Sequence, residues 1–419
     1  MPTDPMPASN PFAKPSRPRA RRLPDWKSLP APDALLEASV IVPVKDEARR
    51  LTATLRCLAA QLGEDGRPMA PSRFEIIVLA NNCTDASAEI VRRYAARRPR
   101  LRLYVVEATF PKPVAHIGHA RACLMNEACR RLLSVGREGG AIASTDGDTR
   151  VAPGWLTATL AEIRAGADAV GGRIVMRADA ASPPGLSRYT RRDATYQRLR
   201  VQLEHALHPD PADPWPRHHQ HFGASLAITP RAYVSVGGLP AEPFLEDEAL
   251  YLALRRHDIR VRHSERVEVL TSNRQHGRVA VGLSWQLREW SKLARERREA
   301  MVPDPAAWAE ELRLRRRLQR IWSSRRDGRG RLSPTNAARA EVLAARLRVP
   351  PRWLGRLLAA NGPFGTVWHE VESRRRRASG QAAPVAMSAA ISALRVLLAQ
   401  QRVRTRRADS VRAASRAAA

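Results

Sequence analysis

Four short apolar segments, separated by amphipathic stretches, constrain the fold of this chain most strongly. Each is a continuous run of mainly β-branched and aliphatic residues, which is typical of a strand buried on both faces of a sheet. These segments are residues 39–43, 74–80, 101–107 and 141–145. The helical stretches between them are residues 47–61, 85–97 and 119–133, and Thr84 or Asp85 can cap the second helix. Because parallel strands need crossover connections that helices supply, the sequence predicts a Rossmann-like α/β fold with a mainly parallel sheet flanked by helices.

The pattern is more mixed after residue 154 and predicts an antiparallel addition to the sheet. We expect strands at 169–176, 224–228, 259–262 and 267–270, and a helix at 248–257. After residue 290, apolar residues recur at helical spacing and many of the residues between them are Arg. We therefore expect four parts: a disordered Pro/Arg-rich lead-in (1–36), an α/β domain (37–290), a helical Arg-rich extension (291–400) and a disordered tail (401–419).

The formal net charge of +30 is less informative than it first appears, because all but five of the 71 basic residues are Arg. Such a bias, beside abundant Ala, partly reflects GC-rich coding, so we do not expect a nucleic-acid partner. The positive field still attracts nucleotides and anionic lipid headgroups. No segment has the roughly 18 apolar residues of a spanning helix, and the four Cys show no metal spacing. We expect a cytoplasmic protein, with peripheral contact at the inner face of the membrane as an option.

Two carboxylates, Asp146 and Asp148, follow the fourth predicted strand and are separated by one glycine that permits a tight turn. Ligands bind beyond the carboxyl ends of the strands in sheets of this type. Hard oxygen ligands suit Mg²⁺ or Mn²⁺, so the pair predicts a metal site; the alternative is an acidic turn that bonds its own backbone. A phosphatase of the Asp-x-Asp type is disfavoured, because Arg150 stands where Thr is usual and the motif follows the fourth strand.

A second acidic group, Glu246, Asp247 and Glu248, precedes an apolar-periodic helix. A carboxylate held there can act as a general base toward an acceptor hydroxyl. The alternative is an acidic helix start that complements the helix dipole. The segment RHHQH at 217–221 is either an acceptor-side loop or a solvated loop, because no Cys or carboxylate at zinc spacing accompanies its histidines.

Taken in order, these segments resemble family 2 glycosyltransferases of the GT-A fold, over roughly residues 38–290. The resemblance implies a nucleotide-sugar donor, a divalent metal (Mg²⁺ or Mn²⁺) at the Asp-Gly-Asp, and a base at the second acidic group. The segments that carry it are SVIVPVKDE, NNCTD, HIGHARACLMNEA, TDGDT, GASLAITPRAYVSVGGLP and LEDEAL.

The resemblance also implies a role for individual residues. Asp148 coordinates the metal, Asp146 contacts ribose or a metal-bound water or is a second ligand, and His276 is a third ligand or a surface residue. Asp247 is the catalytic base, with Glu246 as its orienting neighbour. The residues implied in nucleotide binding are Pro43, Val44, Glu47, Asn81 and, at the diphosphate, Arg121.

The expected activity is metal-dependent transfer of a sugar from a nucleoside-diphosphate sugar, UDP- or GDP-linked, to the hydroxyl of a small or lipid-linked acceptor. We expect inversion at the anomeric carbon. A retaining enzyme of the glucosylglycerate-synthase type stays open, as does a non-enzymatic protein that binds nucleic acid or membranes on an inactive GT-A fold. Processive polysaccharide synthesis is not expected, because the chain has neither Gln-x-x-Arg-Trp nor a membrane span.

Overall fold

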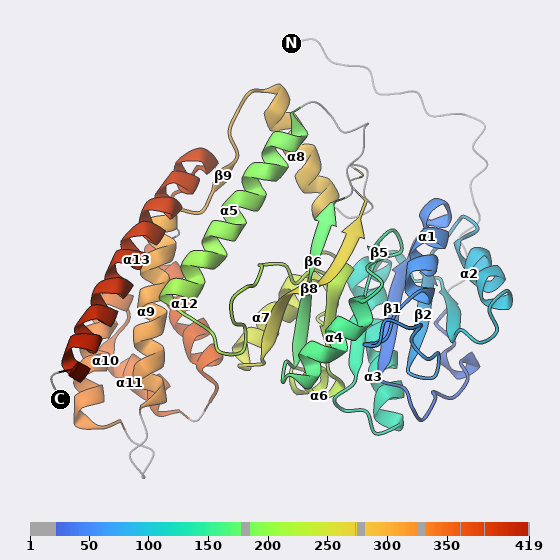
Figure 1. The fold of residues 1–419 in the computed structure, drawn as a ribbon, viewed down its shortest axis with the longest axis horizontal. Helices are drawn as coiled ribbons and strands as arrows, with labels where there is room; N and C mark the ends of the chain where they lie inside the picture. Colours follow the sequence, from blue (N-terminus) through green and yellow to red (C-terminus); the bar gives the residue numbers. More distant parts are fainter. Residues whose placement is uncertain are drawn as a thin grey trace.

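The computed structural model describes residues 22–176, 185–272, 274, 281–324, 332–360, 362–380 and 382–417. It has an α/β part built on one large sheet and a second part made of long helices, which lie side by side (Figure 1). The α/β part holds most of the described chain up to residue 272. Helix α5, Leu186–Leu207, leaves this part and joins the helices from the end of the chain.

The sheet has eight strands in the order β3-β2-β1-β4-β7-β6-β8-β5. Strands β3, β2, β1 and β4 run parallel to one another, and β6 runs parallel to β8. Strand β7 runs antiparallel to β4 and β6, and β5 runs antiparallel to β8. The prediction of a mainly parallel sheet with an antiparallel addition is confirmed. The strands are β1 Ala38–Val44, β2 Phe74–Asn81, β3 Leu103–Ala108, β4 Ala141–Ser144, β5 Arg150–Val151, β6 Ala169–Met176, β7 Leu226–Ile228 and β8 Val261–Thr271.

Helices cover both faces of the sheet because successive residues of each buried strand point to opposite sides. In β1, Val40 and Val42 face one hydrophobic core, while Ile41 faces the other. The first core is covered by α1 Ala48–Ala59, α2 Ser87–Ala96 and α4 Trp155–Arg164. The second core is covered by α3 Ile117–Ser134, α6 Pro230–Ser235 and α7 Glu246–Arg256.

Three local expectations differ from the structure. The two strands expected at 259–262 and 267–270 are one strand, β8, whose pairing with β6 jumps from Ser264 to Glu268. This irregularity interrupts the alternation of apolar and polar residues along β8, and therefore the sequence indicated two strands instead of one. Residues 224–228 begin with a 3-10 turn, η3 Gly223–Ser225, before β7. The N-cap residue of α2 is Ala86 and not Thr84 or Asp85, which were expected from the sequence. Asp85 Oδ1 nevertheless accepts a hydrogen bond from Ser87 N (2.9 Å).

The helical part has two hydrophobic cores of its own. One joins α5 to α8 Leu283–Arg295, α9 Pro305–Ser323 and α13 Met387–Ala417, beside a two-stranded antiparallel sheet of β9 Met301–Val302 and β10 Val385–Ala386. The other joins α9 to α10 Pro334–Leu347, α11 Pro351–Ala359 and α12 Phe364–Ser379. Sequence patterning missed α5, because Arg and other polar residues interrupt its apolar stripe. The predicted tail disorder from residue 401 also differs from the structure, in which α13 continues because Ala and Arg are strong helix formers.

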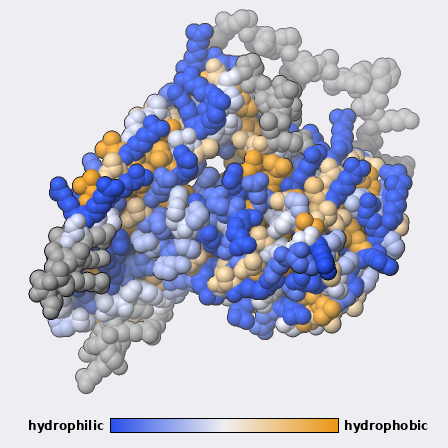
Figure 2. Space-filling model, in the orientation of Figure 1, coloured by the Kyte–Doolittle hydropathy of each residue, from blue (hydrophilic) through white to orange (hydrophobic). Residues whose placement is uncertain are grey.

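The ends of the chain bear on two further expectations. Of the predicted lead-in, residues 22–36 include the short helix η1 Trp26–Ser28 and a backbone bridge between Arg22 and Thr109, while residues 1–21 lie outside the described part. The face shown in Figure 2 is mostly hydrophilic, with apolar residues in separate groups. Among the described residues, no helix combines the length and apolar character needed to cross a membrane.

Candidate active site

The carboxyl ends of β1 and β4 meet at the point where the strand order reverses, which is where open α/β sheets bind ligands. Glu47 follows β1 and lies at the start of α1, while Asp146 and Asp148 follow β4. The Glu47 side chain is 5% exposed and that of Asp148 is 9% exposed, whereas that of Asp146 is 35% exposed. Three carboxylates from two neighbouring strand ends are therefore gathered at this edge of the sheet.

Position 147 favours glycine because the Asp-Gly-Asp turn lies close against the end of β1 and the start of α1. A Cβ at this position would lie 3.0 Å from Val44 Cγ2 and 3.3 Å from Glu47 Cγ, so a larger residue would push the turn away from β1. The carbonyl of Gly147 also accepts a hydrogen bond from the buried Thr54 hydroxyl (3.0 Å). The glycine thus lets Asp146 and Asp148 lie against the start of α1.

Arg274, which follows β8, pairs with two of these carboxylates. Its guanidinium donates to Glu47 Oε1 (2.7 Å) and Oε2 (3.1 Å), and its Nη2 lies 3.3 Å from Asp148 Oδ2. Burial raises the pKa of the Asp148 carboxyl, Arg274 opposes that effect, and Asp146 and Glu47 add to it. Arg274 could not be predicted from the sequence, because a single Arg in an Arg-rich chain has no distinguishing pattern. The expected ligand His276 lies outside the described residues.

Arg121 on α3 connects the Asp-Gly-Asp turn to the second acidic group. It is 3% exposed, and its guanidinium contacts Asp146 Oδ1 (3.1 Å), Glu246 Oε1 (2.9 Å) and the Ser144 hydroxyl (2.5 Å). Burial alone would lower the pKa of Arg121, but the negative charges of Asp146, Glu246 and Asp247 outweigh it and raise the pKa above its usual value. The guanidinium therefore stays charged and holds the two acidic groups in a fixed relation.

The second acidic group lies at the beginning of α7. Glu246 is 3% exposed and faces Arg121, and burial raises the pKa of its carboxyl. Asp247 accepts a hydrogen bond from the backbone N–H of Gly223 (2.7 Å) and one from the N–H of Glu248 (2.9 Å). These contacts fix the orientation of the Asp247 carboxylate at the edge of the Arg121 cluster, so both acidic groups predicted from sequence come together.

Gly223 permits the close packing that joins these groups. Its carbonyl accepts hydrogen bonds from Arg121 Nη1 (3.0 Å) and from the Ser144 hydroxyl (2.8 Å). A Cβ on this residue would lie 2.4 Å from Arg121 Cζ, so any larger residue would displace the guanidinium. Sequence analysis placed this glycine in a recognisable segment without assigning it a contact, because its partners lie far away in the sequence.

The remaining predicted positions are distributed around the same edge. Pro43 and Val44 end β1 and are buried in the sheet, and Asn81 ends β2 with 4% of its surface exposed. Two histidines of the 217–221 segment make specific contacts: His221 Nε2 lies 2.8 Å from Glu248, and His218 Nε2 lies 3.1 Å from the carbonyl of Ser264. A fully solvated loop is therefore wrong for this segment.

The residues at the Asp-Gly-Asp turn fit a divalent cation. Their donor atoms are carboxylate oxygens, which Mg²⁺ and Mn²⁺ prefer, and each Asp already faces a guanidinium, Arg121 or Arg274. A second group, Asp46, Cys83 and Asp85, places three potential ligand atoms within 4.8 Å of one another. Asp46 accepts backbone hydrogen bonds from Thr84 and Asp85, so its arrangement is accounted for by loop structure.

Part of the chain matches a known protein family. Residues 39–213 match the family model described as Glycosyl transferase family 2. No curated protein matches the chain. Among solved structures, the chain is similar to the mannosyltransferase PcManGT from Pyrobaculum calidifontis in complex with GDP-Man and Mn²⁺, with 19% identity, a TM-score of 0.41 and coverage of 90% of both chains. It is also similar to S. aureus TarS 1-349 in complex with UDP-GlcNAc, with 16% identity, a TM-score of 0.39 and coverage of 82% of this chain and 92% of that chain.

The family match includes both strand ends at which the acidic residues gather. Glu47, Arg121, Asp146 and Asp148 all fall within it, while Glu246, Asp247 and Arg274 come from the segment beyond. The sheet order and the helices on both faces are those expected for the GT-A fold. Residues 39–213 therefore belong to a family 2 glycosyltransferase domain, and the sheet that they help to build has the mainly parallel, helix-flanked architecture expected for the GT-A fold.

Proposed function

We propose that this protein transfers a sugar from a nucleoside-diphosphate sugar to an acceptor hydroxyl, with Mg²⁺ or Mn²⁺ at the Asp-Gly-Asp turn and with inversion at the anomeric carbon. One observation carries the proposal. Arg121 forms ion pairs with Asp146 (3.1 Å) and with Glu246 (2.9 Å), so a single buried side chain connects the metal-side turn to the helix that bears Asp247. An acidic turn satisfying only its own backbone does not account for this connection.

The donor would lie at the carboxyl ends of β1, β2 and β4. Pro43, Val44, Glu47 and Asn81 surround the nucleoside in this proposal, with a UDP- or GDP-linked sugar as the donor class. Asp148 and Asp146 hold the metal, which would neutralise the diphosphate as it leaves. His276 is kept as a candidate third ligand.

Asp247 acts in this proposal on the acceptor. Its carboxylate takes the proton of the acceptor hydroxyl as that oxygen forms a bond to the anomeric carbon. The bond from the anomeric carbon to the diphosphate oxygen breaks, and its electron pair leaves with the nucleoside diphosphate. Glu246 and Arg121 position the start of α7, and the backbone N–H of Gly223 fixes the direction of the Asp247 carboxylate.

Titration calorimetry with nucleoside diphosphates and Mn²⁺ tests the two roles separately. Asp148→Ala should weaken metal-dependent binding at least a hundredfold, because it removes a metal ligand. Asp247→Asn should retain that binding while turnover falls by a factor of about a hundred to ten thousand, because a general base is lost. The exposed Asp65 supplies the matched control, Asp65→Asn, which should alter neither.

The proposal fails if the wild-type protein binds no nucleotide in the presence of Mn²⁺. The anomeric configuration of the product, measured by NMR, separates inversion from retention. A product with the donor's configuration would remove the need for Asp247 as a base and favour the retaining alternative.

A further inference from the structure

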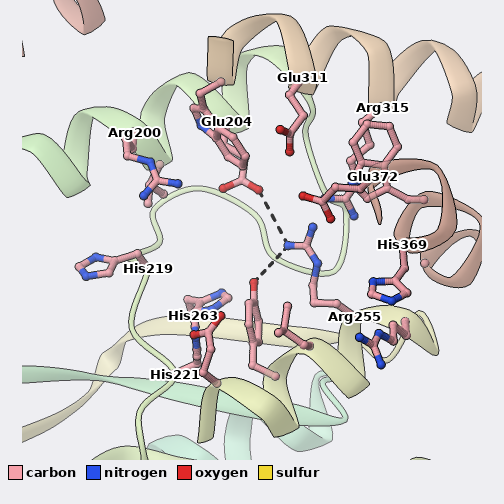
Figure 3. Close-up of a pocket in the computed structure, with 18 of the residues that line it drawn as sticks. Arg200, Glu204, His219, His221, Arg255, His263, Glu311, Arg315, His369 and Glu372 are labelled. Carbon is pink, nitrogen blue, oxygen red and sulfur yellow. Dashed lines mark hydrogen bonds and ion pairs between the residues drawn. The ribbon is translucent and has the colours of Figure 1, made fainter. Parts of the chain in front are cut away.

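A cavity of about 420 Å³ lies between the α/β part and the C-terminal helices (Figure 3). Its walls come from α5, the 217–222 segment, α7, β8, α9 and α12, and we call it the α7–α9 cavity. Phe222 and Glu248 line it, and they are the chain neighbours of Gly223 and Asp247, which are hydrogen-bonded to each other (2.7 Å). The cavity therefore begins one residue away from the proposed base.

The lining of this cavity holds several buried nitrogen atoms that have no hydrogen-bond partner among the described residues. These atoms are Arg217 Nε, His221 Nδ1, His263 Nε2, Trp308 Nε1 and Arg315 Nε. The guanidinium and indole nitrogens among them can only donate. A buried donor left unpaired costs about 1–3 kcal/mol, so the residues around the cavity carry polar groups that the protein itself does not satisfy.

Charged residues of both signs line the cavity in nearly equal number. Five Arg and four Glu line it. Glu204 lies 3.2 Å from Arg217 and 4.0 Å from Arg255, and Figure 3 shows Arg255 reaching toward Glu204. Arg255 Nη1 also donates to the Tyr251 hydroxyl (3.1 Å). His219 adds no charge at neutral pH, because burial, assisted by His221 and His263, lowers its pKa to about 4. The cavity thus has little excess charge with which to select an anion.

Acceptor groups are present beside these donors. The carboxylate of Glu311 points into the same space as that of Glu372 (Figure 3), and Glu311 has no hydrogen-bond partner within the described part of the chain. Burial and the nearby Glu372 raise the pKa of the Glu311 carboxyl. An anionic ligand would be repelled here, whereas a hydroxyl group can donate to Glu311.

Aromatic rings complete the lining. Tyr251, Trp308 and Trp368 line the cavity, and Arg200 lies over the ring of Trp308 at 4.9 Å from its centroid. The negative face of an aromatic ring attracts the weakly positive C–H groups of a sugar ring, while the polar groups around it meet the sugar hydroxyls. We propose that the α7–α9 cavity binds the sugar residues of a neutral carbohydrate acceptor and presents its hydroxyl to Asp247, an inference that rests on the proposed function.

Saturation-transfer NMR on the full chain can test this proposal with neutral probes: glucose, mannose, galactose, N-acetylglucosamine and their disaccharides. At least one should receive saturation from the protein. Trp308→Phe removes the indole N–H but keeps an aromatic ring, and should weaken binding of that probe about tenfold. Glu311→Gln should weaken it about threefold. Trp285→Phe is the matched control, because Trp285 is 42% exposed on α8, and it should leave binding unchanged.

Nucleotide binding with Mn²⁺, measured on the same samples, separates the two proposals. The cavity proposal is overturned if nucleotide binds but no neutral probe does. It is also overturned if Trp308→Phe and Trp285→Phe have equal effects. If a neutral probe binds and Trp308→Phe weakens it while nucleotide does not bind, the donor assignment fails and saccharide binding in the cavity stands.

Discussion

The two sides of the proposed base differ in how their polar groups are satisfied. On the side of the Asp-Gly-Asp turn, each charge has a close partner: Arg121 contacts Asp146 and Glu246, and Arg274 contacts Glu47 and Asp148. In the α7–α9 cavity, by contrast, several buried donors have no partner among the described residues. The first arrangement satisfies its polar groups within the protein, while the second leaves several of them unsatisfied.

This difference has an energetic consequence. A buried ion pair constrains both partners, so removing one partner leaves a charge in an environment that penalises it. A group that has no partner in the folded protein loses no such interaction when it is replaced. Substitutions on the turn side should therefore reduce folding stability, whereas substitutions in the cavity should mainly reduce ligand binding.

The largest contrast is expected between two arginines. Arg121→Met should lower the free energy of unfolding by about 3–5 kcal/mol, because Glu246 and the Gly223 carbonyl lose a buried partner. Arg315→Met should lower it by about 1 kcal/mol or less, since its Nε has no partner and the Met side chain can still pack on Phe364 and Trp368. Urea unfolding followed by circular dichroism measures both changes.

A double substitution checks the physical reason for that contrast. Adding Glu246→Gln to Arg121→Met removes the unpaired carboxylate and should recover part of the lost stability. Equal destabilisation by Arg121→Met and Arg315→Met would show that the two sides do not differ in the way described.

A smaller effect is expected from pH, through His218 in the 217–221 segment. Its Nδ1 accepts a hydrogen bond from the N–H of Gln220 (3.0 Å), so its Nε2 carries the proton and donates to the Ser264 carbonyl. Burial, with His263 nearby, lowers the pKa of His218 to about 3. Because the unfolded chain has a His pKa near 6.5, it binds more protons than the folded protein between these values, and stability falls as the pH drops from about 6.5 toward 3.

Unfolding free energies at pH 7 and pH 4.5 measure this effect. The contribution of His218 to the loss at pH 4.5 should be about 2 kcal/mol, and His218→Asn should remove it. His257→Asn, at an exposed position after α7, is the control. If both variants lose as much stability on acidification as the wild type, protonation of His218 is not responsible.

The contrast also explains how far the sequence could predict this molecule. Asp146, Asp148 and Glu47 directly follow buried strands, so their grouping follows from the rule that parallel strand ends meet at one edge. Trp308 and Arg315 lie on α9, far from His263 in the sequence, and no local pattern distinguishes them from other residues of an Arg-rich helix. Their common position in the cavity depends on long-range packing, which periodicity does not encode.

Arg274 is expected to give the smallest effect. Its guanidinium contacts Asp148, and a metal ion would compete with it for that carboxylate. Its Nη2 lies 3.3 Å from Asp148 Oδ2, so removing the guanidinium leaves more negative charge available to a cation. Arg274→Ala should therefore lower the dissociation constant for Mn²⁺ about three- to tenfold in a calorimetric titration. Arg150→Ala, an exposed position two residues beyond Asp148, should change it little. Weaker Mn²⁺ binding by Arg274→Ala would instead mean that this guanidinium holds Glu47 and Asp148 in the geometry that the metal needs.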